Sequence, residues 1–260
     1  MPERTLAALL SALRSLYGSP DLCASDTGIV HVVSCARAES GSLRVLRVDQ
    51  GSPESETDFL VLNLCRARAD AVLTTARNLR REPGLSHRLA GPWAGALAEL
   101  RRELLKKTAP LCCAILTRSG RLPEDHPVWG DGTQKLILTE PAQASALHQQ
   151  FGQRAEVLAV PNLSARTACA LLERRGATTI SVEAGPTTAS ILYQVPSLVD
   201  ELLLTTCEAA LPPHLLGEAL PDDGQLLSGL TRVACTARTE RGVPFRFERF
   251  RRVTKGEAQG

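Results

Sequence analysis

Strand-forming and helix-forming segments alternate along the chain between residues 59 and 206. Short aliphatic runs predict strands at 71–74, 111–117, 135–139, 156–160, 179–183 and 199–207. Apolar residues at helical spacing predict helices at 59–68, 93–107, 142–151 and 164–175. Strands that alternate with helices are joined by crossovers, so this pattern predicts an α/β fold with a mostly parallel sheet and helices on both faces.

The two ends of the sequence depart from this alternation. Extended segments at 230–238 and 243–253 are joined too closely for a crossover, so we expect an antiparallel hairpin at one sheet edge. Arginines in this region are interleaved with glutamates, which favours a solvated edge strand. A leucine stripe predicts a helix at 5–17, and strands are expected at 29–35 and 43–48.

Domain boundaries follow from the same patterns. We predict an N-terminal helical extension over residues 1–27, one α/β domain over 28–253 and a disordered tail over 254–260. Residues 1–18 carry two arginines and one acid, so a mitochondrial presequence is the alternative to a surface helix.

Composition excludes several classes of function. The 5 Phe, 2 Trp and 2 Tyr are too few to stack bases of single-stranded nucleic acid or to build aromatic-rich β folds. A net charge of +2 gives no attraction to nucleic acid or to acidic membranes. The 8 cysteines lack zinc-site or redox-pair spacing, and no secretory signal precedes them. We therefore expect reduced thiols, no metal and a cytoplasmic location.

Candidate binding residues follow the predicted strands, because ligands of parallel sheets bind beyond the carboxyl ends of strands. Residues 183–188 read Glu-Ala-Gly-Pro-Thr-Thr after one strand, and residues 117–119 read Thr-Arg-Ser after another. Each segment has a structural alternative, a capped tight turn in the first and a solvated arginine in the second. The 5 histidines are scattered and accompany no nucleophile pattern. Neighbours Asp200 and Glu201 would point to opposite faces of a strand, so they cannot act as a pair.

Four segments in this order resemble one family. They are RARADAVLTTARNLRREP (66–83), AILTRSGRLPEDHPVW (114–129), KLILT (135–139) and ISVEAGPTTASILYQVPSLVDELLLT (180–205). The sequence is similar to the reductase domain of riboflavin biosynthesis, over about residues 28–252. The fold that this resemblance implies is that of dihydrofolate reductase: a mixed, mostly parallel sheet with helices on both faces and an antiparallel edge.

The resemblance also implies a reaction and a set of site residues. The family reduces a ribosylaminopyrimidine phosphate with NADPH, as a 5-amino-6-(5-phosphoribosylamino)uracil reductase that sends hydride to C1′ of the sugar. A homodimer, a small-molecule substrate and no metal are expected. The implied catalytic residues are Glu183 and Ser40, and the substrate-binding residues are Ser40, Gly41 and Glu82. The implied cofactor-binding residues are Thr75, Asn78, Thr117, Arg118, Ser119, Thr139, Ala184, Gly185, Thr187 and Thr188.

The sequence departs from the family pattern at three places. Residues 38–41 read Ala-Glu-Ser-Gly where the family has Ser-x-Asp-Gly, and residues 75–78 read Thr-Ala-Arg-Asn where it has Gly-x-Gly-Thr. Ala184 replaces the first of two glycines after the glutamate. A non-catalytic, nucleotide-binding or scaffold descendant of the reductase is therefore the alternative function.

Overall fold

The computed structural model describes residues 4–18, 22 and 28–252. Its strands are β1 (Gly28–Arg37), β2 (Leu43–Leu46), β3 (Ala71–Thr75), β4 (Cys112–Thr117), β5 (Gln134–Thr139), β6 (Glu156–Ala159), β7 (Thr179–Val182), β8 (Val199–Cys207), β9 (Leu216–Ala219), β10 (Thr231–Glu240) and β11 (Val243–Arg251). Its α-helices are α1 (Leu6–Tyr17), α2 (Glu56–Arg68), α3 (Ala76–Arg81), α4 (Ala94–Glu99), α5 (Pro141–Phe151), α6 (Ala165–Arg174), α7 (Pro186–Ala189) and α8 (Asp223–Leu226).

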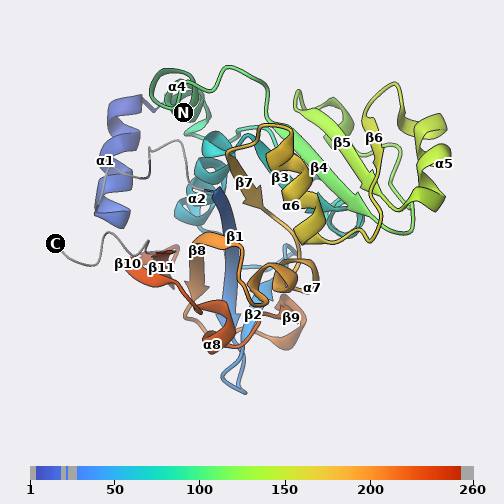
Figure 1. Ribbon diagram of the computed structural model, residues 1–260. Helices are drawn as coiled ribbons and strands as arrows, with labels where there is room; N and C mark the ends of the chain where they lie inside the picture. Colours follow the sequence, from blue (N-terminus) through green and yellow to red (C-terminus); the bar gives the residue numbers. More distant parts are fainter. Residues whose placement is uncertain (1–3, 19–21, 23–27, 253–260) are drawn as a thin grey trace.

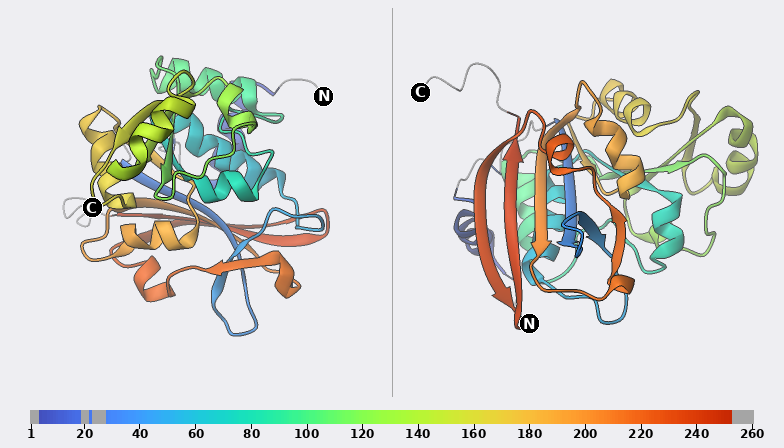
Figure 2. Two further views of the ribbon diagram at one scale, coloured as in Figure 1. Left: turned by 90° about the vertical axis from the view of Figure 1, so that its right-hand side faces the viewer. Right: turned by 90° about the horizontal axis from the view of Figure 1, so that it is seen from below.

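All the strands of these residues belong to one sheet, in the order β10-β11-β8-β1-β7-β3-β4-β5-β6, with β2 and β9 paired beside β1 (Figure 1). The seven strands from β8 to β6 run parallel. β11 is antiparallel to both β8 and β10, and these strands lie side by side in Figure 2. The mixed, mostly parallel sheet and its antiparallel edge hairpin are thus confirmed.

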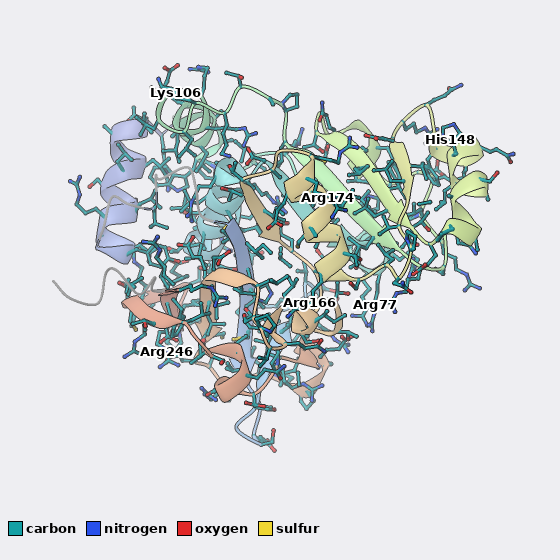
Figure 3. The ribbon with its side chains drawn as sticks, viewed as in Figure 1. Arg77, Lys106, His148, Arg166, Arg174 and Arg246 are labelled. Carbon is teal, nitrogen blue, oxygen red and sulfur yellow. The ribbon has the colours of Figure 1, made fainter. Side chains whose placement is uncertain are left out.

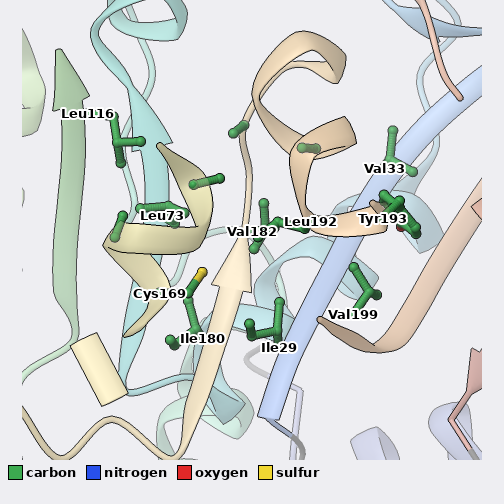
Figure 4. Close-up of a cluster of buried hydrophobic side chains, with 14 of the residues drawn as sticks. Ile29, Val33, Leu73, Leu116, Cys169, Ile180, Val182, Leu192, Tyr193 and Val199 are labelled. Carbon is green, nitrogen blue, oxygen red and sulfur yellow. The ribbon is translucent and has the colours of Figure 1, made fainter. Parts of the chain in front are cut away.

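The central parallel strands β3, β4 and β7 are buried on both faces because helices cover each face. In β4, Ala114 and Leu116 pack into one hydrophobic cluster, and Cys113 and Ile115 pack into another on the opposite face. Figure 4 shows the first cluster, where Cys169 of α6 lies over aliphatic side chains of the strands. Burial of nearly every aliphatic side chain explains why these strands appear in the sequence as continuous apolar runs.

Helix ends follow the sequence signals closely. Ser164 caps α6, because its side chain accepts a hydrogen bond from the Thr167 backbone N–H. The Thr167 hydroxyl accepts in turn from the Ser164 backbone N–H, which completes a capping box. Gly18 ends α1 in the left-handed conformation, at a φ of 73°. The predicted helix over 93–107 is shorter than expected, since α4 ends at Glu99 and continues only as a π-helical turn over Leu100–Leu104.

The N-terminal helix packs on the main sheet. Leu9, Leu13 and Leu16 are buried in a cluster with Phe245 and Phe247 of β11 and with side chains of α2 and α4. The rest of the predicted extension is largely outside the described residues, and the predicted tail, 254–260, lies wholly outside them. Within the described residues, no helix has the length and apolar character needed to span a bilayer.

The expectation of a solvated edge strand in the C-terminal hairpin is confirmed for β10 and wrong for β11. β10 forms the sheet edge and has only exposed and half-buried residues, whereas β11 lies between β10 and β8. Arg249 is therefore buried, with 1% exposure, and its Nε donates to Glu201 Oε1 at 2.5 Å. As expected, Asp200 points elsewhere: its carboxylate accepts from the backbone of Ile29 and from Arg252.

Candidate functional site

A cavity of about 430 Å³ opens where β1, β2, α2, α3, β9 and the loop after β7 converge. The side of α2 that faces it carries Asp58, Leu62 and Arg66, which are spaced four residues apart. This spacing places them on one helix face, while Leu60, Val61 and Leu64 pack into the core. The volume is that of a small-molecule binding site.

Glu183 and Arg66 form a buried ion pair in the cavity wall. The Arg66 guanidinium donates from Nε and Nη2 to the two Glu183 carboxylate oxygens, at 2.8 and 2.7 Å. Their side chains are only 3% and 8% exposed. Burial on its own raises the pKa of Glu183, but the charge and hydrogen bonds of Arg66 outweigh it and lower the pKa. Glu183 is therefore a fixed anion and not a proton donor.

His87 lies beside this pair. Its Nε2 is 3.7 Å from Glu183 Oε2, and its Nδ1 is 3.4 Å from Cys113 Sγ. Burial lowers the pKa of His87 to about 4, although the Glu183 charge opposes the shift. The ring is thus neutral at neutral pH.

Asp58 provides a second kind of carboxyl group in the cavity. The Ser34 hydroxyl, on β1, donates to Asp58 Oδ1 at 2.6 Å. Burial raises the pKa of Asp58 against the effect of hydrogen bonds from Ser34 and Thr205, and the Glu240 carboxylate raises it further. Burial likewise raises the pKa of Glu82, with a contribution from the charge of Glu183. The cavity thus combines one anionic carboxylate with two carboxyls that retain their protons more strongly.

His31 lines the floor of the cavity from the middle of β1. Its Nδ1 is 2.7 Å from the Tyr193 hydroxyl, and the two rings pack edge to face with centroids 5.6 Å apart. Burial lowers the pKa of His31 to about 4. The neutral imidazole and the phenol therefore fix each other's orientation at the floor of the cavity.

Glu218 of β9 lines the cavity, and its side chain is partly exposed at the cavity mouth. Its carboxylate is paired with Arg77 and with Arg81, both on α3, and it accepts a hydrogen bond from Thr187 Oγ1 at 2.7 Å. Figure 3 shows Arg77 on the side of the molecule where α7 lies. Glu218 thus links α3, β9 and α7 at this entrance.

The structure brings five of the sequence-predicted site residues together at this cavity. They are Asn78, Glu82, Glu183, Ala184 and Gly185, and they come from α3, its C-terminal end and the loop after β7. Asn78 Nδ2 donates to the Glu183 backbone carbonyl at 2.8 Å, which joins the two segments. Thr75 lies directly behind them, as the N-cap of α3.

Other predicted cofactor residues lie along the same sheet edge but outside the cavity. Thr117 and Thr139 are paired in register at the ends of β4 and β5, and Thr139 Oγ1 donates to the Thr117 carbonyl at 2.8 Å. The Arg118 guanidinium donates twice to the Leu163 carbonyl, at 3.1 and 2.8 Å. Ser119 is exposed, and Thr188 of α7 is half-buried. Their binding roles stay predictions.

Ser40 and Gly41 lie away from the cavity. They occupy the exposed turn between β1 and β2, where the Ser40 and Ser42 hydroxyls are 2.9 Å apart. Gly41 has a φ of 84°, and its carbonyl accepts from Arg37. The geometry shows a tight hairpin turn at this place and no contact with the cavity wall, so a catalytic role for Ser40 has no geometric support.

Sequence reasoning missed Asp58, His31, Arg66, Tyr193 and Glu218. The four-residue spacing of Asp58, Leu62 and Arg66 was a usable signal, because it places two charged groups on one helix face. Across the described residues, no group of three or more His, Cys, Asp or Glu side chains has the arrangement of a metal site.

A model of the RibD C-terminal domain matches residues 43–243. The protein belongs to the RibD C-terminal domain family. Its fold is shared with a pyrimidine reductase-like protein from Corynebacterium diphtheriae, at a TM-score of 0.64 and 21% identity, over 93% of this chain and 98% of that one. A search of curated protein sequences found no match.

Two longer proteins share the fold of this RibD C-terminal domain. One is RibD of Acinetobacter baumannii, with a TM-score of 0.60 and 16% identity over 88% of this chain and 59% of that one. The other is a diaminohydroxyphosphoribosylaminopyrimidine deaminase/5-amino-6-(5-phosphoribosylamino)uracil reductase from Thermotoga maritima, with a TM-score of 0.57 and 15% identity over 88% and 57%. The present protein spans less than two thirds of either.

Proposed function

We propose that this protein is an NADPH-dependent reductase that acts on a ribosylaminopyrimidine phosphate. Family membership supports a pyrimidine reductase. The structural observation that most supports this proposal is that Asn78, Glu82 and Glu183 line one cavity. These residues come from two segments about 100 residues apart, and both segments follow strands of the parallel sheet, where ligands of such sheets bind.

Two observations at the edge beside the cavity support a nucleotide cofactor. Thr117 Oγ1 is buried at this edge without a hydrogen-bond partner among the described residues. A Cβ placed on Gly185 would meet only Asn78 Oδ1, at 3.8 Å, so the backbone here is open to a bound group. Gly185, Thr187 and Thr188 would hold the pyrophosphate, and Thr117, Arg118 and Ser119 the adenosine side. The cofactor, when bound, supplies the hydride that reduces C1′ of the sugar.

The protein's own residues would orient the substrate and control its charge. The Glu183 carboxylate would offer a hydrogen-bond acceptor to a polar substrate ring. The neutral His31 ring would lie beside the same substrate without adding a charge. Leu62 and Leu220 supply apolar walls, in place of the aromatic platform that this composition lacks. A homodimer and a cytoplasmic location belong to the same proposal.

Cofactor binding is tested by thermal unfolding with saturating NADPH, with NADH and without either. We expect NADPH to raise the melting temperature, since a ligand at a hundredfold excess over Kd stabilises the fold by about 2.7 kcal/mol. Arg118→Ala should remove the preference for NADPH over NADH, while the matched control Arg121→Ala, an exposed arginine of the same loop, should keep it. Oxidation of NADPH with 5-amino-6-(5-phosphoribosylamino)uracil then tests the substrate.

One observation favours the non-catalytic alternative. Arg77 stands where the family has glycine, and its side chain is committed to Glu218 at the mouth of the cavity. If neither nicotinamide cofactor shifts the melting temperature, the reductase proposal fails and a scaffold function remains.

A further inference from the structure

The cavity contains an acid that neither the family pattern nor the proposed reductase chemistry accounts for. Asp58 reaches it from α2, at the opposite end of the helix face from Arg66. The two Cα atoms are eight residues apart, roughly 12 Å along a helix that rises about 1.5 Å per residue. The cavity therefore has an anionic end at Glu183 and a separate carboxyl end at Asp58.

The surroundings of Asp58 suit a proton donor. Ser34 Oγ donates to Oδ1 at 2.6 Å, and the Thr205 hydroxyl also hydrogen-bonds this carboxyl, so two hydroxyl groups fix the carboxyl plane. The electrostatic neighbours are Glu240 on β10, Tyr17 on α1 and Cys35 on β1, and none of these three is a cation. Burial and the Glu240 charge both raise the pKa of Asp58. Glu183, by contrast, is paired with Arg66 and stays ionised.

We infer that Asp58 is the general acid of the proposed reduction, and this inference rests on the proposed function. When hydride adds to C1′ of the ring-opened imine form of the substrate, the π electron pair of the C=N bond moves to nitrogen. Nitrogen takes the proton from the Asp58 carboxyl, and the resulting carboxylate is reprotonated from water. The nicotinamide cofactor supplies the two electrons, and Asp58 supplies the single proton that the product needs.

The first test needs no cofactor. Carbon-13 NMR of the full-length protein follows the Asp58 carboxyl signal with pH, and Asp58→Asn assigns that signal by removing it. We expect a titration midpoint above the ordinary aspartate value of about 3.9, because burial raises the pKa of this carboxyl. A midpoint at or below that value overturns the inference, whatever the activity of the protein.

The second test uses the kinetics of NADPH oxidation. Asp58→Asn should lower kcat by on the order of 100- to 10,000-fold and leave the KM for NADPH unchanged. The wild-type kcat should fall as pH rises through the pKa of Asp58, because a general acid must hold its proton. Ser34→Ala removes a hydrogen bond that favours the carboxylate, so this descending limb should move to higher pH.

Two further variants separate the outcomes. Glu82→Gln, at the other carboxyl with a raised pKa, should keep the descending limb, and the exposed Asp125→Asn should match the wild type. If the wild type turns over and Asp58→Asn turns over equally, or if the limb is lost with Glu82→Gln, only the inference fails. If the wild type oxidises no NADPH, the proposed function fails and the general-acid role fails with it.

Discussion

The carboxyl groups of the cavity differ in charge because their neighbours differ. Glu183 and Asp58 are both buried, yet the pKa of Glu183 is lowered and that of Asp58 is raised. The difference is the guanidinium of Arg66, which hydrogen-bonds Glu183 through two of its nitrogens, whereas the Asp58 carboxyl has only hydroxyl partners. Residue type alone therefore does not decide which carboxyl holds a proton.

At the residue scale, two buried histidines predict a loss of stability in acid. Burial lowers the pKa of both His31 and His87 to about 4, whereas the pKa of histidine in the unfolded chain is about 6.5. Between these values the unfolded state binds more protons. The free energy of unfolding should thus fall as pH drops from about 6.5 to about 4, by on the order of 3 kcal/mol for each ring.

Urea unfolding across that pH range checks this prediction. His31→Asn and His87→Asn should each lose less stability on acidification than the wild type does. If both variants keep the wild-type dependence on pH, the rings are not buried in their neutral form.

At the element scale, a buried ion cluster joins α2, β8 and β11. Glu201 accepts from Arg68 Nη2 at 2.7 Å and from Arg249 Nε at 2.5 Å, and all three side chains are 1% exposed. Glu201→Leu removes the anion between two buried guanidinium groups, so we expect a loss of about 3–5 kcal/mol in the free energy of unfolding.

Denaturant unfolding should show recovery in the triple variant Arg68→Met, Glu201→Leu, Arg249→Met. Replacing a whole buried ion cluster with apolar side chains of similar volume is often neutral, whereas breaking it is costly. If Glu201→Leu alone fails to fold, the stability of the triple variant still tests the prediction. An unchanged midpoint for Glu201→Leu would show that the cluster contributes nothing to holding these elements together.

At the scale of the whole molecule, α1 is part of the main core. Leu13 is 2% exposed and belongs to the cluster that contains Phe245 and Phe247. We expect Leu13→Ala to cost about 2–5 kcal/mol through the cavity it leaves. The exposed Ser11→Ala of the same helix serves as the control.

The effect of Leu13→Ala should be measured with a fluorescent residue that lies far from α1. In a Trp93→Phe background, the remaining tryptophan is Trp129, which packs on Phe151 of α5 with ring centroids 4.7 Å apart. Its fluorescence transition should move to lower denaturant in Leu13→Ala, because one cooperative unit unfolds together. A Trp129 transition that does not move would show that α1 folds independently.

Local signals in the sequence predicted most of the elements. The apolar run at 111–117 became β4, Ser164 capped α6, and Gly18 ended α1. These features depend on neighbours within a few residues, so they can be inferred without the fold. The short strand β9 was missed, since its four residues are half-buried or exposed and carry no apolar pattern.

The sequence by itself determined the α/β class, the parallel sheet and the two segments that supply Asn78, Glu82 and Glu183. Only the tertiary structure decided which polar groups meet: Arg66 with Glu183, 117 residues apart, Tyr193 with His31, 162 residues apart, and Ser34 with Asp58. The physical reason is that periodicity reports burial and local conformation, whereas partners across a sheet are set by strand order. Here β7 lies between β1 and β3, and the residue that follows it, Glu183, meets Arg66 of α2.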